Sequence, residues 1–276
     1  MRIFKIFFIR VLNSTCLVAL IPILSIGQNT DTTNPDNIIE QYLTGCASKY
    51  NYNYQMNEWQ QCLDEGLKKD STIAYLWQQK AMPYFKVKKY EVGMRFLDKA
   101  VQIDPKRWQP YRAFIKCIFQ KSYAESLIDF ESCIEKWGDQ YEMDHPYSFY
   151  MALCYLQLNE FKKAEQLLEN YIQTTIKLRG TEWVHPTALF YLGITLYEQQ
   201  SYAEAIQRFD QALEIYKNFS DVKVYKALCL MYLNKDVELA NILMLEAKED
   251  SKKGYTINED NVIYETYPYQ KKWHDH

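Results

Sequence analysis

Two histidine–proline pairs are the residues of this sequence whose type and spacing first suggest chemistry. His145 precedes Pro146 and His185 precedes Pro186, 40 residues further along the chain. Paired imidazoles could ligate a metal ion or transfer a proton in catalysis. Proline, however, is favoured in the first turn of a helix, because the N–H that it lacks would have no partner there. We therefore interpret both pairs as helix starts.

Cysteine is the second residue type that could carry chemistry. Six cysteines lie beyond the first 30 residues, and no two of them have the Cys-x-x-Cys spacing of zinc ribbons and redox motifs. All six lie in segments with helical apolar spacing, so we expect small buried side chains. The pair to test for a disulfide is Cys46 with Cys62, on the two facing helices of one predicted hairpin. The other four are Cys117, Cys133, Cys154 and Cys229.

Further signs of catalysis, of a cofactor or of nucleic-acid binding are not found in the sequence. The short motifs of metalloproteases, serine hydrolases, dinucleotide-binding enzymes and P-loop NTPases do not occur. His274 and His276 lie at the chain terminus, where a frayed end explains them better than a metal site. The net charge is −3, without a run of Lys or Arg. We predict no enzymatic activity, no cofactor, no metal and no nucleic-acid partner.

The N-terminal segment has the features of an export signal. Three basic residues lie within the first ten positions, an apolar stretch runs from Cys16 to Ile26, and a small-x-small cleavage pattern ends at Gly27. The apolar stretch is shorter than the ~20 residues that a bilayer span requires. We predict a signal peptide at 1–27 and a flexible linker at 28–37. The mature protein would lie in the periplasm or outside the cell, with an uncleaved N-terminal membrane anchor as the alternative.

Three stretches of the remaining chain share one pattern of bulky and small residues. In 74–105 it is carried by Trp77, Ala81, Tyr84, Tyr90, Gly93, Leu97, Ala100 and Pro105. In 145–172 it is carried by Ala152, Tyr155, Phe161, Ala164 and Leu168. In 186–215 it is carried by Leu189, Leu192, Gly193, Tyr202, Ala205, Phe209 and Ala212. Apolar residues within each stretch recur at the three- and four-residue spacing of an amphipathic helix.

Weaker copies of the pattern are found by their period. The positions that correspond to the small residue of the second helix are Gly66, Ala100, Cys133, Tyr171, Ala212 and Ala247. The steps between them are 34, 33, 38, 41 and 35 residues. The two long steps meet at Tyr171, so insertions are expected on both sides of the fourth copy.

These copies resemble the tetratricopeptide repeat (TPR), a helical hairpin with a period near 34 residues. In such a hairpin the small residues let two helices approach closely, and bulky residues fill the space between successive hairpins. No hairpin buries its apolar face alone, so stacking supplies the stability. We predict an all-α fold, an α-solenoid of about six TPR-like hairpins over 38–250, with a non-helical aromatic C-terminal tail at 251–276.

The resemblance implies that a ligand lies in the concave groove lined by the first helix of each hairpin. The repeat register gives the candidate groove residues Tyr75, Gln78, Met82, Trp108, Tyr111, Arg112, Ile115, Phe149, Leu153, Phe190, Ile194, Tyr197 and Tyr225. Aromatic residues with few charges are typical of a buried protein interface. If the register is shifted by one residue, the same side chains are ordinary core between repeats.

The function implied by the resemblance is the binding of another protein or peptide. We predict a binding scaffold in the periplasm or cell envelope, without an integral membrane span after signal cleavage. One alternative is a dedicated partner, such as an immunity or regulatory protein that sequesters a single target. A second alternative is an enzyme whose site the repeats conceal.

The C-terminal tail at 251–276 has no helical periodicity but is rich in tyrosine. A disordered tail would contain fewer aromatic residues, so we expect this one to pack on the solenoid. It could cap the last hairpin or lie in the groove of its own chain.

Deletion of residues 255–276 tests the capping alternative. If the tail covers the last hairpin, its removal exposes apolar surface and lowers the melting temperature measured by circular dichroism. An unchanged melting temperature would exclude the cap.

Overall fold

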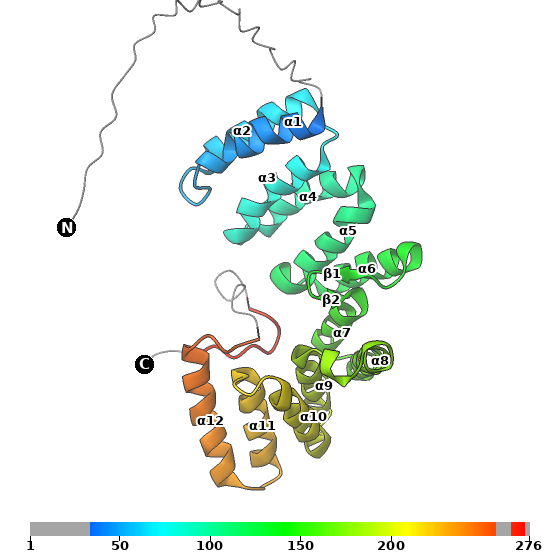
Figure 1. The fold of residues 1–276 in the computed structure, drawn as a ribbon, viewed down its shortest axis with the longest axis vertical. Coiled ribbons are helices and arrows are strands. Elements are labelled where there is room, and N and C mark those ends of the chain that lie inside the picture. The colour runs from blue at the N-terminus through cyan, green and yellow to red at the C-terminus, as the bar shows by residue number, and fades with distance from the viewer. Residues whose placement is uncertain (1–33, 258–265, 274–276) are drawn as a thin grey trace, which may run out of the picture.

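The computed structural model describes residues 34–257 and 266–273, and this part of the chain contains twelve α-helices. The helices pack as six consecutive hairpins, which stack into a curved array (Figure 1). The prediction of an all-α solenoid of about six TPR-like hairpins is confirmed. The predicted signal peptide at 1–27 lies outside the described residues.

The first three hairpins occupy the N-terminal half of the array. The first contains α1 (Pro35–Ile39), the π-helix η1 (Glu40–Thr44), the 3-10 turn η2 (Ala47–Lys49) and α2 (Met56–Lys69). The second pairs α3 (Ala74–Lys86) with α4 (Tyr90–Ile103). In the third, α5 (Pro105–Phe114) continues as the π-helix η3 (Ile115–Gln120) and pairs with α6 (Tyr123–Trp137). Helix α1 begins within the segment 28–37 that was predicted as a linker.

The last three hairpins follow after a short β-hairpin. Strands β1 (Tyr141–Glu142) and β2 (His145–Pro146) are antiparallel. The fourth hairpin pairs α7 (Tyr147–Gln157) with α8 (Phe161–Arg179), and the 3-10 turn η4 (Thr181–Trp183) follows it. The fifth pairs α9 (Pro186–Glu198) with α10 (Tyr202–Ile215), and the sixth pairs α11 (Ser220–Tyr232) with α12 (Val237–Lys252).

The two long steps of the repeat correspond to added structure around the fourth hairpin. The β-hairpin β1–β2 lies between α6 and α7, and accounts for the step before Tyr171. Helix α8 has 19 residues where α10 has 14, and η4 follows it, which accounts for the step after Tyr171. The insertions leave the order of the hairpins unchanged.

Glycine at two helix contacts explains how closely the paired helices approach. A Cβ atom on Gly93 of α4 would lie 2.4 Å from the Phe85 ring and 3.2 Å from the carbonyl oxygen of Ala81, both on α3. A Cβ atom on Gly193 of α9 would lie 2.4 Å from the Phe209 ring on α10. The two distances of 2.4 Å are far inside van der Waals contact. The small residues therefore set the separation of the two helices, as the repeat pattern predicts.

The six cysteines within the described residues divide into one bonded pair and four free side chains. Cys46 and Cys62 form a disulfide that joins the loop after η1 to α2, with Cα atoms 5.7 Å apart and a sequence separation of 16. A loop of this length stabilises the fold by about 3 kcal/mol, because it restricts the unfolded chain. Cys117, Cys133, Cys154 and Cys229 are free and buried. No helix within 34–257 or 266–273 has the length and apolarity of a bilayer span.

The contact at Gly193 gives a test of the packing argument. Gly193→Val should lower the free energy of unfolding by about 1–3 kcal/mol, because the added methyl groups collide with the Phe209 ring. The matched control is Ala203→Val on the exposed side of α10, which should lower it by only about 0.5 kcal/mol through helix propensity. Urea unfolding followed by circular dichroism measures both. Equal effects would contradict the packing argument.

Candidate functional site

The first helices of the second and third hairpins bring six of the predicted groove residues together. We call this set the α3–α5 patch: Tyr75, Gln78, Met82, Trp108, Tyr111 and Ile115. The Tyr75 ring stacks on Trp108 with centroids 6.2 Å apart, and Trp108 meets Tyr111 edge-on at 5.9 Å. The Tyr111 hydroxyl donates to Sδ of Met82 at 2.9 Å. Tyr75 is the most open member, with 40% of its surface exposed.

A small cavity and two charged side chains adjoin the α3–α5 patch. The cavity has a volume of about 150 Å³ and is lined in part by Met82, Tyr111 and Ile115. The Arg107 guanidinium lies 4.6 Å from the centre of the Trp108 ring and 3.5 Å from the Glu142 carboxylate. Burial raises the pKa of Tyr111 to about 12, so its hydroxyl stays protonated near neutral pH. Gln78, Trp108, Tyr111 and Ile115 are themselves buried, so Tyr75 and the half-buried Met82 are the members that an apolar side chain could reach.

Arg112 does not belong to this surface, which corrects the prediction. Its guanidinium lies 2.7 Å from Asp98 on α4 and 2.6 Å from Asp129 on α6. Asp129 also lies 2.8 Å from the Lys116 ammonium. Arg112 therefore points toward the second helices, where it is held between two carboxylates. A buried carboxylate requires such partners, and Asp129 is buried.

Four further predicted groove residues are interior rather than surface: Phe149, Leu153, Phe190 and Ile194, each with 0% of its surface exposed. The Phe149 ring lies 6.2 Å from Tyr171 on α8, between the two helices of the fourth hairpin. The Phe190 ring lies 5.4 Å from Phe219, in the joint between the fifth and sixth hairpins. The prediction is wrong in treating these positions as open groove, because their side chains turn into the packed layer between hairpins.

The described part of the tail lies on the inner side of the curved array, against the first helices α9 and α11 (Figure 1). The Tyr191 hydroxyl donates to the carbonyl oxygen of Pro268 at 3.0 Å. The Tyr269 hydroxyl donates to Oε1 of Glu198 at 2.8 Å. The predicted groove residues Tyr197 and Tyr225 are half-buried beside it, and the rings of Tyr225 and Tyr269 are 5.9 Å apart.

Asp221, the second residue of α11, holds the main chain of the tail at two points. Its carboxylate accepts hydrogen bonds from the N–H groups of Ile257 at 2.9 Å and Lys271 at 2.6 Å. Asp221 has 0% of its surface exposed, and burial raises its pKa to about 6 against the opposing effect of these bonds. At the far end of the segment, the Lys121 ammonium donates to the carbonyl oxygen of Thr266.

Sequence reasoning did not find Asp221, Tyr191 or Glu198. An acidic residue in the first turn of a helix is common because it complements the helix dipole, so Asp221 carries no distinguishing signal. Tyr191 follows the predicted Phe190 directly, so a register shifted by one residue would have selected it. Glu198 is a C-terminal helix residue in a chain with many surface carboxylates. Its role depends on where a segment 71 residues away in sequence folds back.

The pair His185–Pro186 starts α9, as predicted, whereas His145–Pro146 forms strand β2 directly before α7, and the two pairs meet in space. Pro186 lies in the first turn of α9, and Nδ1 of His185 accepts from the N–H of Thr187 at 3.2 Å, which caps the helix. Pro146 directly precedes α7. The imidazoles of His145 and His185 lie 4.7 Å apart. Among the described residues, no three His, Cys, Asp or Glu side chains are grouped as a metal site requires.

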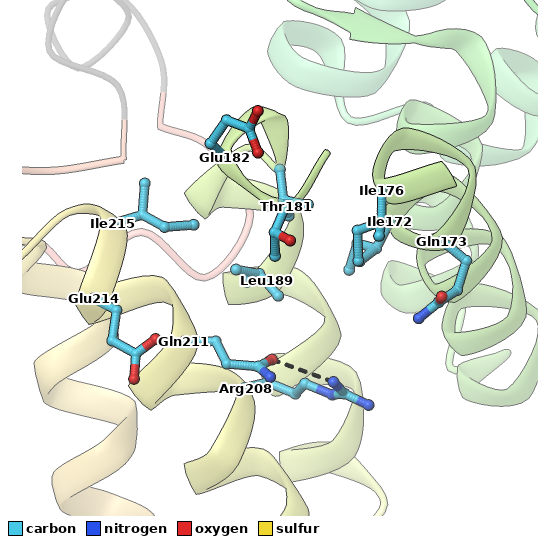
Figure 2. Close-up of a pocket in the computed structure, with 11 residues that line it drawn as sticks. Ile172, Gln173, Ile176, Thr181, Glu182, Leu189, Arg208, Gln211, Glu214 and Ile215 are labelled. Atoms are coloured by element: carbon cyan, nitrogen blue, oxygen red, sulfur yellow. Dashed lines mark hydrogen bonds between the residues drawn. The ribbon is translucent and has the colours of Figure 1, made fainter. Parts of the chain in front are cut away.

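A cleft of about 410 Å³ lies between the second helices α8 and α10 (Figure 2). Ile172, Ile176 and Leu189 line its apolar part, and Arg208 and Gln211 of α10 are joined at its edge by a hydrogen bond of 3.2 Å. It lies at the insertion around α8 and η4, since both contribute to its wall. Its polar side chains include no nucleophile paired with a base.

Comparison with known proteins concerns both sequence and fold. The tetratricopeptide repeat family model matches residues 147–218. No curated protein matches the sequence. The fold is similar to that of PilW, a type IV pilus biogenesis factor, with a TM-score of 0.59 and 16% identity over 82% of this chain and 98% of that chain.

Two other solved structures have similar folds. A tetratricopeptide repeat protein from Parabacteroides merdae gives a TM-score of 0.58 and 13% identity over 80% of this chain and 78% of that chain. Pseudomonas aeruginosa pilF gives 0.55 and 14% over 79% and 99%. At these identities the likeness concerns the fold alone.

The buried imidazole of His145 predicts a stability that depends on pH. Burial, and the neighbouring His185, hold the pKa of His145 well below its ordinary value of 6.5. Below about pH 6.5 the imidazole is protonated in the unfolded chain but stays neutral in the folded chain. The free energy of unfolding therefore falls as the pH drops, by at most about 1.4 kcal/mol per pH unit. The melting temperature measured between about pH 7.5 and 5.5 should show this decline.

The variant His145→Asn removes the titrating group and should flatten the decline. His185→Asn should flatten the decline only in part, because it removes a second imidazole whose pKa burial lowers and one cause of the lowered pKa of His145, while asparagine can still cap α9. A decline of equal slope in wild type and His145→Asn would contradict the assignment.

Proposed function

We propose that this chain is a tetratricopeptide-repeat protein and serves as a scaffold that binds a segment of another polypeptide on the first-helix face of its solenoid. The observation that carries the proposal is the pair of main-chain N–H groups held by the buried Asp221. A carboxylate removed from water is stable only with such donors. This face therefore has side chains suited to a polypeptide backbone, with the chain's own tail as the present example.

The α3–α5 patch supports the same proposal in the other half of the array. Within the patch, the exposed Tyr75 ring stacks on Trp108. An apolar cavity adjoins Met82 and Tyr111. Aromatic residues around a pocket are the usual centres of binding energy in protein interfaces. We propose the patch as the part of the groove that a partner contacts first, since the tail contacts described above lie on α9 and α11.

We further propose that the protein acts in the periplasm or cell envelope. Two observations support export: the charge and apolar pattern of 1–27, and the Cys46–Cys62 disulfide, which an oxidising compartment preserves. An uncleaved N-terminal membrane anchor would leave the solenoid in the same oxidising compartment. We propose no catalytic role, because His185 caps α9, His145 is buried in strand β2, and the cleft at α8 has no nucleophile with a base.

A dedicated partner of one target, such as an immunity or regulatory protein, is the second candidate function. The half-buried tyrosines Tyr197 and Tyr225 favour it, because a tightly fitted aromatic surface suits a single ligand. The number of ligands separates the two candidates: several weak ligands indicate a scaffold, and one tight ligand indicates a dedicated partner.

An array of short synthetic peptides of varied sequence, probed with the purified full chain, tests the proposal. Several peptides should bind, and Trp108→Ala should weaken their binding by about 1–3 kcal/mol, because it removes the aromatic centre of the α3–α5 patch. The matched control is Trp183→Ala, an exposed tryptophan of η4 outside this face, which should leave binding unchanged. An array without binding, or equal losses in both variants, would refute the proposal.

A further inference from the structure

We propose that the inner face of α9 and α11 is a binding site for a proline-containing β-turn with the order tyrosine–proline–tyrosine. In this chain residues 267–270 occupy it, and a protein partner that presents such a turn would bind by displacing them. This inference rests on the proposed function, since it names the class of partner. We call the site the α9–α11 site; its polar members are Tyr191, Glu198 and Asp221.

The occupying segment has the geometry of a type II turn. The N–H of Gln270 donates to the carbonyl oxygen of Tyr267 at 3.2 Å, which closes the four-residue turn. Pro268 stands at its second position and Tyr269 at its third, with a φ of +61°. Proline at the second position and a positive φ at the third define this turn type. Proline restricts the free segment toward this shape, so a short peptide can present it without the rest of the chain.

The site bonds the main chain at two points, one in the turn and one directly after it. Tyr191 donates to the Pro268 carbonyl oxygen, and Asp221 accepts from the N–H of Lys271, the residue after the turn. Proline has no N–H, so the site needs no acceptor at that position. These two bonds go to backbone groups, so a partner with the same turn could make them whatever its flanking side chains.

The two tyrosine side chains give the site its selectivity. Tyr267 retains only 8% of its surface and is part of the main hydrophobic core. Tyr269 is held by the hydrogen bond to Glu198 and by the Tyr225 ring. A tyrosine with positive φ is disfavoured by about 1–2 kcal/mol, so the hydroxyl bond and the ring contact have to offset this strain. A turn without the third-position tyrosine would lose both.

The chain's own segment fits the site incompletely. Among the described residues, Nε2 of Gln270 and Nε1 of Trp273 are buried without a hydrogen-bond partner. Each buried donor without a partner costs about 1–3 kcal/mol. Both lie beyond the tyrosine–proline–tyrosine core. A partner with the same core and different flanking residues can therefore bind the site more tightly than the segment that fills it.

A simple cap on the last hairpin does not explain these contacts. Part of the segment does contact the sixth hairpin: the carbonyl oxygen of Tyr255 accepts from the N–H of Ser220 at 2.9 Å, and Asp221 holds two N–H groups of the tail. The turn reaches Tyr191 and Glu198 in the fifth hairpin, and Thr266 reaches Lys121 in the third. A segment that follows the first helices across several hairpins lies where the resemblance places a ligand.

A labelled peptide with the sequence of residues 266–273 is the probe, and fluorescence anisotropy measures its binding to the full chain. In wild type the attached segment competes at a high effective concentration, so binding should be weak. The double variant Tyr267→Ala with Pro268→Ala empties the site without changing it and should bind the probe about tenfold more tightly or better. Adding Tyr191→Phe should weaken that binding severalfold, because one hydroxyl bond is lost.

Two controls keep the result decisive. A probe with alanine in place of proline should bind the double variant several times more weakly, and a scrambled probe should not bind. If the double variant loses its helical circular dichroism, Tyr269→Ala replaces it, since this change leaves the buried Tyr267 in place. Equal binding to wild type and to the folded opened variant, or equal binding of the scrambled probe, overturns the inference.

The outcome is separable from that of the peptide array. If array peptides bind in a way that depends on Trp108 while the turn probe fails, the inference about the α9–α11 site is wrong and the proposed function stands. If both fail, the proposed function falls as well.

Discussion

The structure depends on one constraint: no helical hairpin in this chain can bury its apolar face without a neighbour. Small residues such as Gly93 and Gly193 let the paired helices approach closely. The resulting compact hairpins can stack on one another. Stacking then places the first helices side by side along one inner face (Figure 1). The aromatic surface of that face follows from this arrangement, since side chains too large for the helix contacts are directed between hairpins or toward the interior of the curve.

The same constraint explains how much the sequence could predict. The period, the small residues and the helix starts are local features, so six hairpins and the insertions around α8 could be predicted. In the second and third hairpins the repeat register selected side chains that contact one another, as Trp108 does with Tyr75 and Tyr111. In the fourth and fifth hairpins it selected Phe149 and Phe190, which are interior.

Contacts between residues far apart in the sequence could not be predicted from its patterns. Asp221 reads as an ordinary acidic residue in a first helical turn, and only the folded position of residues 257 and 271 gives it a second role. Arg112 reads as a groove cation, but two aspartates on the second helices bind it. In both cases the decisive partner lies on another element, so spacing within one helix carries no information about it.

The Cys46–Cys62 disulfide gives the two ends of the array different characters. A terminal hairpin has one stacking neighbour where an internal hairpin has two. At the N-terminal end a covalent bond within the hairpin compensates for the missing neighbour, whereas at the other end non-covalent contacts of the tail do so. The N-terminal hairpin is therefore held together by a covalent bond, whereas the C-terminal hairpin is held by contacts that can break and re-form. Fraying, and any exchange of partners, would begin from the C-terminal hairpins and proceed toward the disulfide.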